Sequence, residues 1–365
     1  MSNHADYSVD PTIVLDTGRS NYVRAVAFHP DGKHLLSEND DGVQRWRLSD
    51  GQEIGKQTGM RVFAISVSRD HEWIVCGTRK GASVWDGDMH ERVIDMEGTS
   101  KVWAVDTSPD ATRFATGTNK DASIWTLTRG ERLVGPLEHE NLVNGIRFSS
   151  NGDHIATACL GNSIHIFDSQ TGDELITINT DIPGWGAVTP LAWSSDTQQI
   201  FAASHDNKIR SFNTFTGSQL AESQILHGSD YNVHCITLAA NGKFIATFAK
   251  HSISFLDTST LTRVGPVIED SEQIRSITIS ADSNHLVTGQ TNGKIIIRAL
   301  SKILPDSWSI PCKYLCLYNL GMSNNPHSVA YGDKLHRNLL ASKCVQTSNL
   351  LHRAVTITRH PTLVQ

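Results

Sequence analysis

The stretch Ala25-Val26-Ala27-Phe28-His29-Pro30-Asp31-Gly32, followed by His34-Leu35-Leu36-Ser37, joins two short apolar runs through a tight turn. The turn residue returns six more times with the same flanking pattern, at spacings of 39, 40, 41, 45, 45 and 41 residues. These recurrences are Asp70, Asp110, Asn151, Asp196, Asn241 and Asp282. Seven copies of one unit at a period near forty residues indicate a repeat architecture.

Three further columns of the repeat hold apolar residues at fixed distances from the turn. Five residues before it stands a branched aliphatic: Val26, Ile65, Val105, Ile146, Leu191, Ile236 and Ile277. Four residues after it come Leu35, Ile74, Phe114, Ile155, Ile200, Ile245 and Leu286. Fifteen or sixteen residues after it come Trp46, Trp85, Trp125, Phe167, Phe212, Leu256 and Arg298. Arg298 is the one residue that breaks the last column.

Apolar and polar residues alternate within each copy, as in Ile277-Thr278-Ile279, which is the periodicity of a half-buried strand. Asp-Gly or Asn-Gly at residues 31, 151 and 241 supplies turn residues that tolerate positive φ and close a hairpin. Each copy therefore predicts three adjacent strands and a fourth, outer one. One such sheet cannot bury both of its faces, whereas seven packed around an axis can. The sequence predicts an all-β, seven-bladed β-propeller of four-stranded antiparallel blades.

These columns resemble the WD-repeat family, through the aliphatic-x-Phe-x-Pro-Asp-Gly pattern at Val26 to Gly32 and the Trp85-Asp86 pair that closes a third strand. The segments 130–136 (GERLVGP) and 262–266 (TRVGP) are similar to divergent repeats attached to fungal NACHT-type proteins. The resemblance covers about residues 11–300 and implies an interaction scaffold with a protein or peptide partner.

The chain departs from the family in its buried His–Ser/Thr–Asp–Trp hydrogen-bond network. The His of that network survives only as His139 and His227, whereas a small or hydroxyl residue is better kept in the second strand. An orphaned buried partner costs more than a lost hydrogen bond. We therefore expect the networks to be absent together rather than half made.

The domain prediction has three parts. Residues 1–10 are expected to be flexible, and residues 11–300 to form the propeller. Residues 11–18 carry a strand pattern without a partner in its own copy, and we expect that strand to close the ring against the last blade. Pro305 argues against the alternative closing segment at residues 302–305. Residues 301–365 lack the period and are expected to be a poorly ordered extension that folding does not require.

Charge and composition exclude several function classes. The net charge of −6 argues against non-specific nucleic-acid binding. Residues 301–365 hold seven Lys or Arg against two Asp or Glu, so the tail is basic and the rest acidic. The start of the chain has no signal-peptide pattern, and no apolar run is long enough to cross a membrane. We expect a reduced protein of the cytoplasm or nucleus, either monomeric or in a hetero-complex. The dispersed cysteines Cys76, Cys159 and Cys235 are interpreted as small buried apolar residues.

We identify no catalytic, cofactor or metal site in the sequence. Cys312, Cys316, Cys344 and His336 lack the spacing of a zinc set, and histidines such as His29 and His34 are interpreted as solvated turn residues. Dispersed carboxylates suggest no acid/base pair.

A partner site is predicted where the inner strands begin, on what we call the top face. Counting six and four residues back from the Phe28 column gives a sector of aromatic and basic residues on blades seven, one, two and three. Its members are Tyr22, Arg24, Arg61, Phe63, Lys101, Trp103 and Arg275. Aromatic residues with Arg are typical of interface hot spots. The alternative is that Phe63 and Trp103 only plug the channel mouth.

Two alternative functions remain. A propeller enzyme, such as a metal-dependent lactonase-like hydrolase, would need convergent carboxylates at the channel mouth, and the predicted ring has almost none. A ligand-reading module related to NACHT-type sensors is the other alternative.

Overall fold

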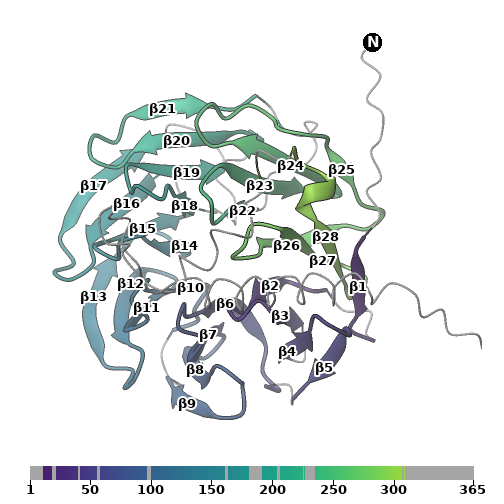
Figure 1. The fold of residues 1–365 in the computed structure, drawn as a ribbon. Helices are drawn as coiled ribbons and strands as arrows, with labels where there is room; N and C mark the ends of the chain where they lie inside the picture. The colour runs from purple at the N-terminus through teal and green to yellow at the C-terminus, as the bar shows by residue number, and fades with distance from the viewer. Residues whose placement is uncertain are drawn as a thin grey trace, which may run out of the picture.

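The computed structural model describes residues 11–18, 22–39, 42–55, 58–96, 100–160, 163–180, 191–203, 206–224, 226, 235–305 and 308. These residues form seven sheets of four strands each, arranged in a ring (Figure 1). The predicted all-β, seven-bladed propeller is confirmed. Within the described ranges no helix has the length and apolar character needed to span a membrane.

The first strand of each blade lies at the axis, and the second strand forms the next layer outward. The first strands are β2 (Ala25–Phe28), β6 (Val62–Val67), β10 (Ala104–Thr107), β14 (Val143–Phe148), β18 (Leu191–Trp193), β22 (Cys235–Leu238) and β26 (Ile274–Ile279). The second strands are β3 (His34–Asn39), β7 (Trp73–Thr78), β11 (Arg113–Gly117), β15 (His154–Cys159), β19 (Gln199–Ala203), β23 (Phe244–Ala249) and β27 (His285–Gln290).

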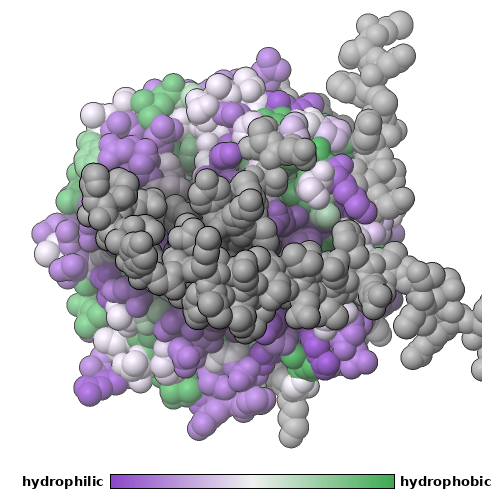
Figure 2. Space-filling model, in the orientation of Figure 1, coloured by the Kyte–Doolittle hydropathy of each residue, from purple (hydrophilic) through white to green (hydrophobic). Residues whose placement is uncertain are grey.

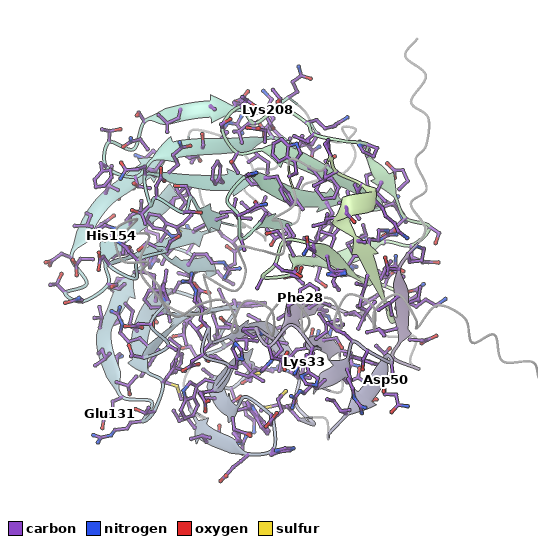
Figure 3. All side chains as sticks on the ribbon, in the orientation of Figure 1. Phe28, Lys33, Asp50, Glu131, His154 and Lys208 are labelled. Atoms are coloured by element: carbon purple, nitrogen blue, oxygen red, sulfur yellow. The ribbon has the colours of Figure 1, made fainter. Side chains whose placement is uncertain are left out.

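The third and fourth strands form the outer half of each blade. The third strands are β4 (Gly42–Arg47), β8 (Ala82–Asp86), β12 (Asp121–Thr126), β16 (Ser163–Asp168), β20 (Ile209–Asn213), β24 (Ser252–Asp257) and β28 (Lys294–Ala299). The fourth strands are β5 (Gln52–Ile54), β9 (Arg92–Asp95), β13 (Arg132–Glu138), β17 (Glu174–Asn179), β21 (Gln219–Glu222), β25 (Ile268–Glu269) and β1 (Ile13–Asp16). Figure 3 shows Phe28 near the axis, whereas Asp50 and Glu131 lie at the rim.

The sequence columns become the core because the strand register aligns them. In blade one Leu35 pairs with Trp46 and Val26 with Ser37, and the same pairs of columns face each other in the other six blades. All seven residues of the second-strand column are fully buried. One repeated pattern thus sets the register and the core at once, since a one-residue slip would expose every column.

The turn between the first and second strands needs positive φ at the residue after the Asp/Asn column. Gly32, Gly152 and Gly242 supply it, as predicted. The other four blades place His71, Ala111, Thr197 and Ser283 there, with φ of 73°, 56°, 62° and 56°. Those blades adopt the same backbone conformation without the glycine, and side-chain hydrogen bonds hold the turn there. In blade two, for example, the Ser68 hydroxyl donates to Asp70 at 2.5 Å.

Strand β1 closes the ring by pairing with β28, antiparallel, with Ile13 opposite Ile297 and Asp16 opposite Lys294. Figure 1 shows the purple β1 beside the last strands of the green part of the chain. Leu15 is 2% exposed and packs with Ile295, Ile297 and Trp46. The sequence prediction that this strand pairs with the last blade is confirmed, and residues 302–305 do not take the position.

The chain continues past the predicted boundary at residue 300. A 3-10 helix, η1 (Leu300–Lys302), follows β28, and Ile303, Leu304 and Trp308 pack on the core of blade six. The predicted flexible segment 1–10 and nearly all of the tail from residue 306 lie outside the described residues.

The expectation that the buried networks are absent together is wrong. Trp46 Nε1 donates to Ser37 Oγ at 2.8 Å, and Trp125 Nε1 donates to Thr116 Oγ1 at 2.9 Å. In blade four, where Phe167 replaces Trp, His139 Nε2 lies 2.7 Å from Thr157 Oγ1. The networks survive only as separate pairs, and the equivalent second-strand hydroxyl of blade seven, Thr288 Oγ1, is buried without a hydrogen-bond partner.

Candidate partner-binding site

Phe63 and Trp103 lie together on the top face, at the starts of the inner strands of blades two and three. Their ring centroids are 5.3 Å apart and their planes are tilted by 42°. Lys101 Nζ lies 3.3 Å from the Trp103 ring centroid and 4.2 Å from that of Phe63, and the Arg61 guanidinium lies 5.5 Å from Phe63. Cation–π attraction stabilises this arrangement. We call these four residues the Trp103 cluster.

A second group lies on blades seven and one. The guanidinium of Arg275 lies 5.0 Å from the Tyr22 ring centroid and that of Arg24 lies 5.9 Å from it. Tyr22 is 44% exposed. Arg24 Nη1 also lies 3.7 Å from Glu38 Oε1, whose side chain is fully buried. We call Tyr22, Arg24 and Arg275 the Tyr22 cluster. The positive charge of Arg24 is therefore partly compensated, which the sequence did not indicate.

Positive charge accumulates at the Trp103 cluster. Desolvation of the ammonium, with the nearby charges of Arg79 and Arg61, lowers the pKa of Lys101. Like charges brought together favour the loss of a proton or the arrival of an anion. The sector therefore favours a negatively charged ligand.

Two residues that interact with the Trp103 cluster were missed by counting along the inner strands. Asn119 Oδ1 accepts a 2.7 Å hydrogen bond from Trp103 Nε1, and Arg79 acts on Lys101. Both stand in turns between second and third strands. Those turns reach the top face because the second strand runs antiparallel to the first and ends beside the point where the first strand begins. This topology could have been used to predict from the sequence that Asn119 and Arg79 lie near the cluster.

The two proposed roles of the aromatic pair differ in burial. Phe63 and Trp103 are half-buried and lie outside the core clusters of the described residues. A hot-spot role is consistent with that exposure, whereas a channel plug would be buried. The corresponding positions of blades five and six, at residues 187, 189, 232 and 234, lie outside the described residues.

A histidine cluster on the opposite face, where first strands turn into second strands, is the one set of metal-ligand type among the described residues. Asp31 Oδ2 lies 3.1 Å from His29 Nδ1 and 2.5 Å from His34 Nδ1. Burial alone would raise the pKa of Asp31, but hydrogen bonds from both histidines and the Lys33 amide hold it well below its ordinary range. Arg45 Nη2 lies 3.2 Å from His34 Nδ1, and a guanidinium there disfavours a bound cation.

The interpretation of these histidines as solvated is wrong for His29, which is 4% exposed. His29 occupies the position that Ser68 holds in blade two, two residues before the turn Asp. It therefore replaces the serine hydroxyl as the partner of that carboxylate and is drawn into the turn. This substitution in the column is the sequence signal for the cluster.

The three described cysteines are not alike. Burial raises the pKa of Cys76 to about 12 and that of Cys235 to about 11. Cys76 is buried as expected, whereas Cys235 is only partly buried and packs against the core of blade six. Cys159 is buried too, but its Sγ lies 3.5 Å from Ser163 Oγ in a polar cluster with His165. The interpretation of Cys159 as a purely apolar residue is therefore wrong.

The fold and the repeat columns define a β-propeller of the WD type, and comparisons with known proteins agree. The family profile "WD domain, G-beta repeat" matches residues 11–46, 91–126 and 132–168. The matched repeats are of the WD type, and the chain is similar to proteins of the WD-repeat family.

Several curated proteins are similar to the chain. WD repeat-containing protein 1 of Gallus gallus is 26% identical over 172 residues, covering 43% of this chain and 26% of that protein. The intraflagellar transport protein 122 homolog of Xenopus tropicalis is 21% identical over 280 residues, 74% of this chain and 23% of that protein. The chain thus spans about a quarter or less of the length of these relatives.

A solved structure shows the same fold. The β-propeller domain of Cps50 (Swd1) from Myceliophteria thermophila aligns with a TM-score of 0.66 at 17% identity, covering 79% of this chain and 99% of that domain. WD-repeat propellers are generally protein-interaction scaffolds.

Proposed function

We propose that the chain is a non-catalytic scaffold that binds an acidic segment of a protein partner at the Trp103 and Tyr22 clusters. The observation that carries the proposal is the stacking of Lys101 on Trp103 and Phe63, with Arg61 and Arg79 close by. Such a site offers flat apolar surfaces for side chains and cations for carboxylates. Aromatic and Arg anchors surrounded by weaker contacts are the usual composition of a binding hot spot.

Charge distribution supports an acidic rather than a basic partner. Residues 1–300 hold 25 Lys or Arg against 36 Asp or Glu, so the positive sector is exceptional within an acidic propeller. An acidic segment would be repelled from most of the propeller and attracted here, so charge would both steer and orient docking. The described surface that is visible in Figure 2 is mainly hydrophilic, with small separate apolar spots.

Replacing Trp103 by Ala is expected to weaken partner binding by about 2 kcal/mol or more, because a hot-spot aromatic is lost. The folded chain should lose only about 1 kcal/mol of stability, since Trp103 is half-buried. The measurement is affinity capture of the full chain with quantitative mass spectrometry, together with the melting temperature, for Trp103→Ala and Phe63→Ala. Phe215→Ala is the matched control, because Phe215 is 61% exposed in blade five.

Arg61→Glu is expected to slow association and flatten its salt dependence, since it reverses a steering charge. Arg129→Glu makes the same charge change in blade three, where the side chain is 75% exposed, and should leave capture unchanged. A Trp103→Ala protein that loses 3–5 kcal/mol of stability, as a buried aromatic does, but keeps its partners would support the channel-plug alternative and contradict the proposal.

A further inference from the structure

A hydrogen-bonded relay joins a carboxylate to a thiol across three strands of blade four. Glu174 Oε1 lies 2.8 Å from His165 Nδ1, and His165 Nε2 lies 2.9 Å from Ser163 Oγ. Ser163 Oγ in turn lies 3.5 Å from Cys159 Sγ. The order carboxylate, imidazole, hydroxyl and thiol is one in which protons can be exchanged from end to end. No role in partner binding or in the core accounts for it.

His165 is fixed in this arrangement from several sides. The Glu174 carboxylate accepts from Nδ1–H, so Nε2 is the nitrogen turned towards Ser163 and Cys159. Phe167 stacks on the imidazole at 6.1 Å with an interplanar angle of 17°, and His139 meets it edge-on at 5.0 Å. Thr177 Oγ1 donates to Glu174 Oε1 and holds that carboxylate in place. The ring is thus oriented before any reaction takes place.

The other titratable group facing the relay does not compete for its proton. His139, in the segment between β13 and β14, lies 2.8 Å from the Leu137 carbonyl through Nδ1 and 2.7 Å from Thr157 Oγ1 through Nε2. Nδ1–H therefore donates to the carbonyl, and Nε2 accepts from the hydroxyl. Burial lowers the pKa of His139 and so favours its neutral form, although the hydrogen bond to Leu137 and the charges of Glu174 and Asp121 oppose that effect.

The electrostatic environment of the relay lowers the pKa of the thiol. Burial alone would raise the pKa of Cys159, but hydrogen bonds from His165 and Ser163 outweigh it and lower the pKa. The hydrogen bond with Cys159 and the one with Glu174 raise the pKa of His165 against the effect of burial. The two pKa values shift in opposite directions, towards each other, as expected when a thiolate and an imidazolium stabilise each other.

We propose that Cys159 is a peroxide-reactive thiol, activated by His165 and Glu174, and that blade four carries a site of reversible oxidation. The thiolate attacks one oxygen of a hydroperoxide, an S–O bond forms and the O–O bond breaks. Sulfur is oxidised by two electrons to the sulfenic acid and the peroxide is reduced. The leaving hydroxide or alkoxide takes the proton from His165 Nε2, directly or through the Ser163 hydroxyl. A sulfenic acid is the reversible first product of thiol oxidation.

The low solvent exposure of Cys159 limits the size of the oxidant that can react with it. Cys159 is 4% exposed, whereas the side chains of His165 and Glu174 are 21% and 45% exposed. A molecule close to water in size can reach such a sulfur, but a bulky reagent cannot. The substrate class is therefore hydrogen peroxide or a very small hydroperoxide.

The test treats the full folded chain with limiting hydrogen peroxide between pH 5 and pH 9. Catalase stops the reaction, the chain is denatured in a 1,3-dione that traps sulfenic acids, and mass spectrometry quantifies each cysteine peptide. Cys159 is expected to oxidise at least about tenfold faster at pH 7 than Cys76 and Cys235, the internal controls. The midpoint of its pH–rate profile should lie below the ordinary thiol value of about 8.5.

Variants of the relay residues test whether the reactivity of Cys159 comes from activation by His165 and Glu174 or only from its exposure to solvent. His165→Gln should reduce the Cys159 rate about tenfold and raise the midpoint, and Glu174→Gln should do so to a smaller degree. His154 lies in β15, as Cys159 does, but it stacks on Trp193. His154→Gln should therefore change neither the rate nor the midpoint. Equal rates for Cys159, Cys76 and Cys235 in the native chain would overturn the proposal. A Cys159 rate unaffected by both His165→Gln and Glu174→Gln in folded protein would do the same.

Discussion

Replacing Leu15 by Ala is expected to lower the free energy of unfolding by about 2–5 kcal/mol, the usual cost of emptying a buried leucine position. Leu15 is 2% exposed and packs between Trp46 of blade one and Ile295 and Ile297 of blade seven. Deleting residues 1–18 removes the whole strand, and we expect this deletion to abolish cooperative unfolding. The measurement is chemical denaturation followed by tryptophan fluorescence and circular dichroism.

Val14→Ala provides the control for that experiment. Val14 stands next to Leu15 in β1 but points to the other side and is 46% exposed. Its replacement should cost less than about 0.5 kcal/mol, as surface changes do. If Leu15→Ala and Val14→Ala had equal, small effects, the ring would not depend on β1 for closure.

Asp270→Ala is expected to destabilise the fold by about 3–5 kcal/mol, because it leaves a buried guanidinium without its carboxylate. Arg298 Nη2 pairs with Asp270 Oδ1, and the two side chains are 6% and 5% exposed. The pair joins the segment after β25 in blade six to β28 in blade seven. Arg298 is the residue that breaks the apolar third-strand column, and this partner explains how a cation can occupy that buried position.

The double variant Asp270→Leu with Arg298→Met should recover most of the lost stability, since apolar residues of similar volume replace buried ion pairs well. Asp95→Ala is the exposed control. Its partner Arg92 lies 2.8 Å away, but the side chains are 38% and 33% exposed, so the loss should be below about 1 kcal/mol. A loss for Asp270→Ala as small as for Asp95→Ala would contradict the buried-pair account.

The fold could be predicted from the sequence because the repeat records the register directly. Leu35 and Trp46 stand eleven residues apart in the chain and face each other across one hairpin, and each blade repeats this local relation. Closure by residues 13–16 could be predicted for a different reason. An unpaired strand and an incomplete blade both expose backbone hydrogen-bonding groups at a sheet edge, and pairing the two removes both exposed edges.

The contacts of the site could be predicted only in part. Counting along the strands placed Phe63, Lys101 and Trp103 at the same end of neighbouring blades, but it gave no information about Asn119 or Arg79 in other turns. Asp270 could not be matched to Arg298 because the pair occurs in one blade only, so no column reveals it. The relay from Glu174 to Cys159 was missed because each residue looks ordinary in its own strand. Only the packing of β15, β16 and β17 brings them together.

Closure by β1 also has a consequence for the order in which the chain is made. Ile13 leaves the ribosome early, but its partner Ile297 is synthesised 284 residues later, which takes about 15–60 s at usual rates of translation. Blades one to six can form their hairpins during that interval, while Leu15 still has no complete pocket. A nascent chain therefore carries an apolar strand that any exposed sheet edge can capture, including one on a neighbouring chain. Chaperone engagement should accordingly be strongest while blade seven is still missing.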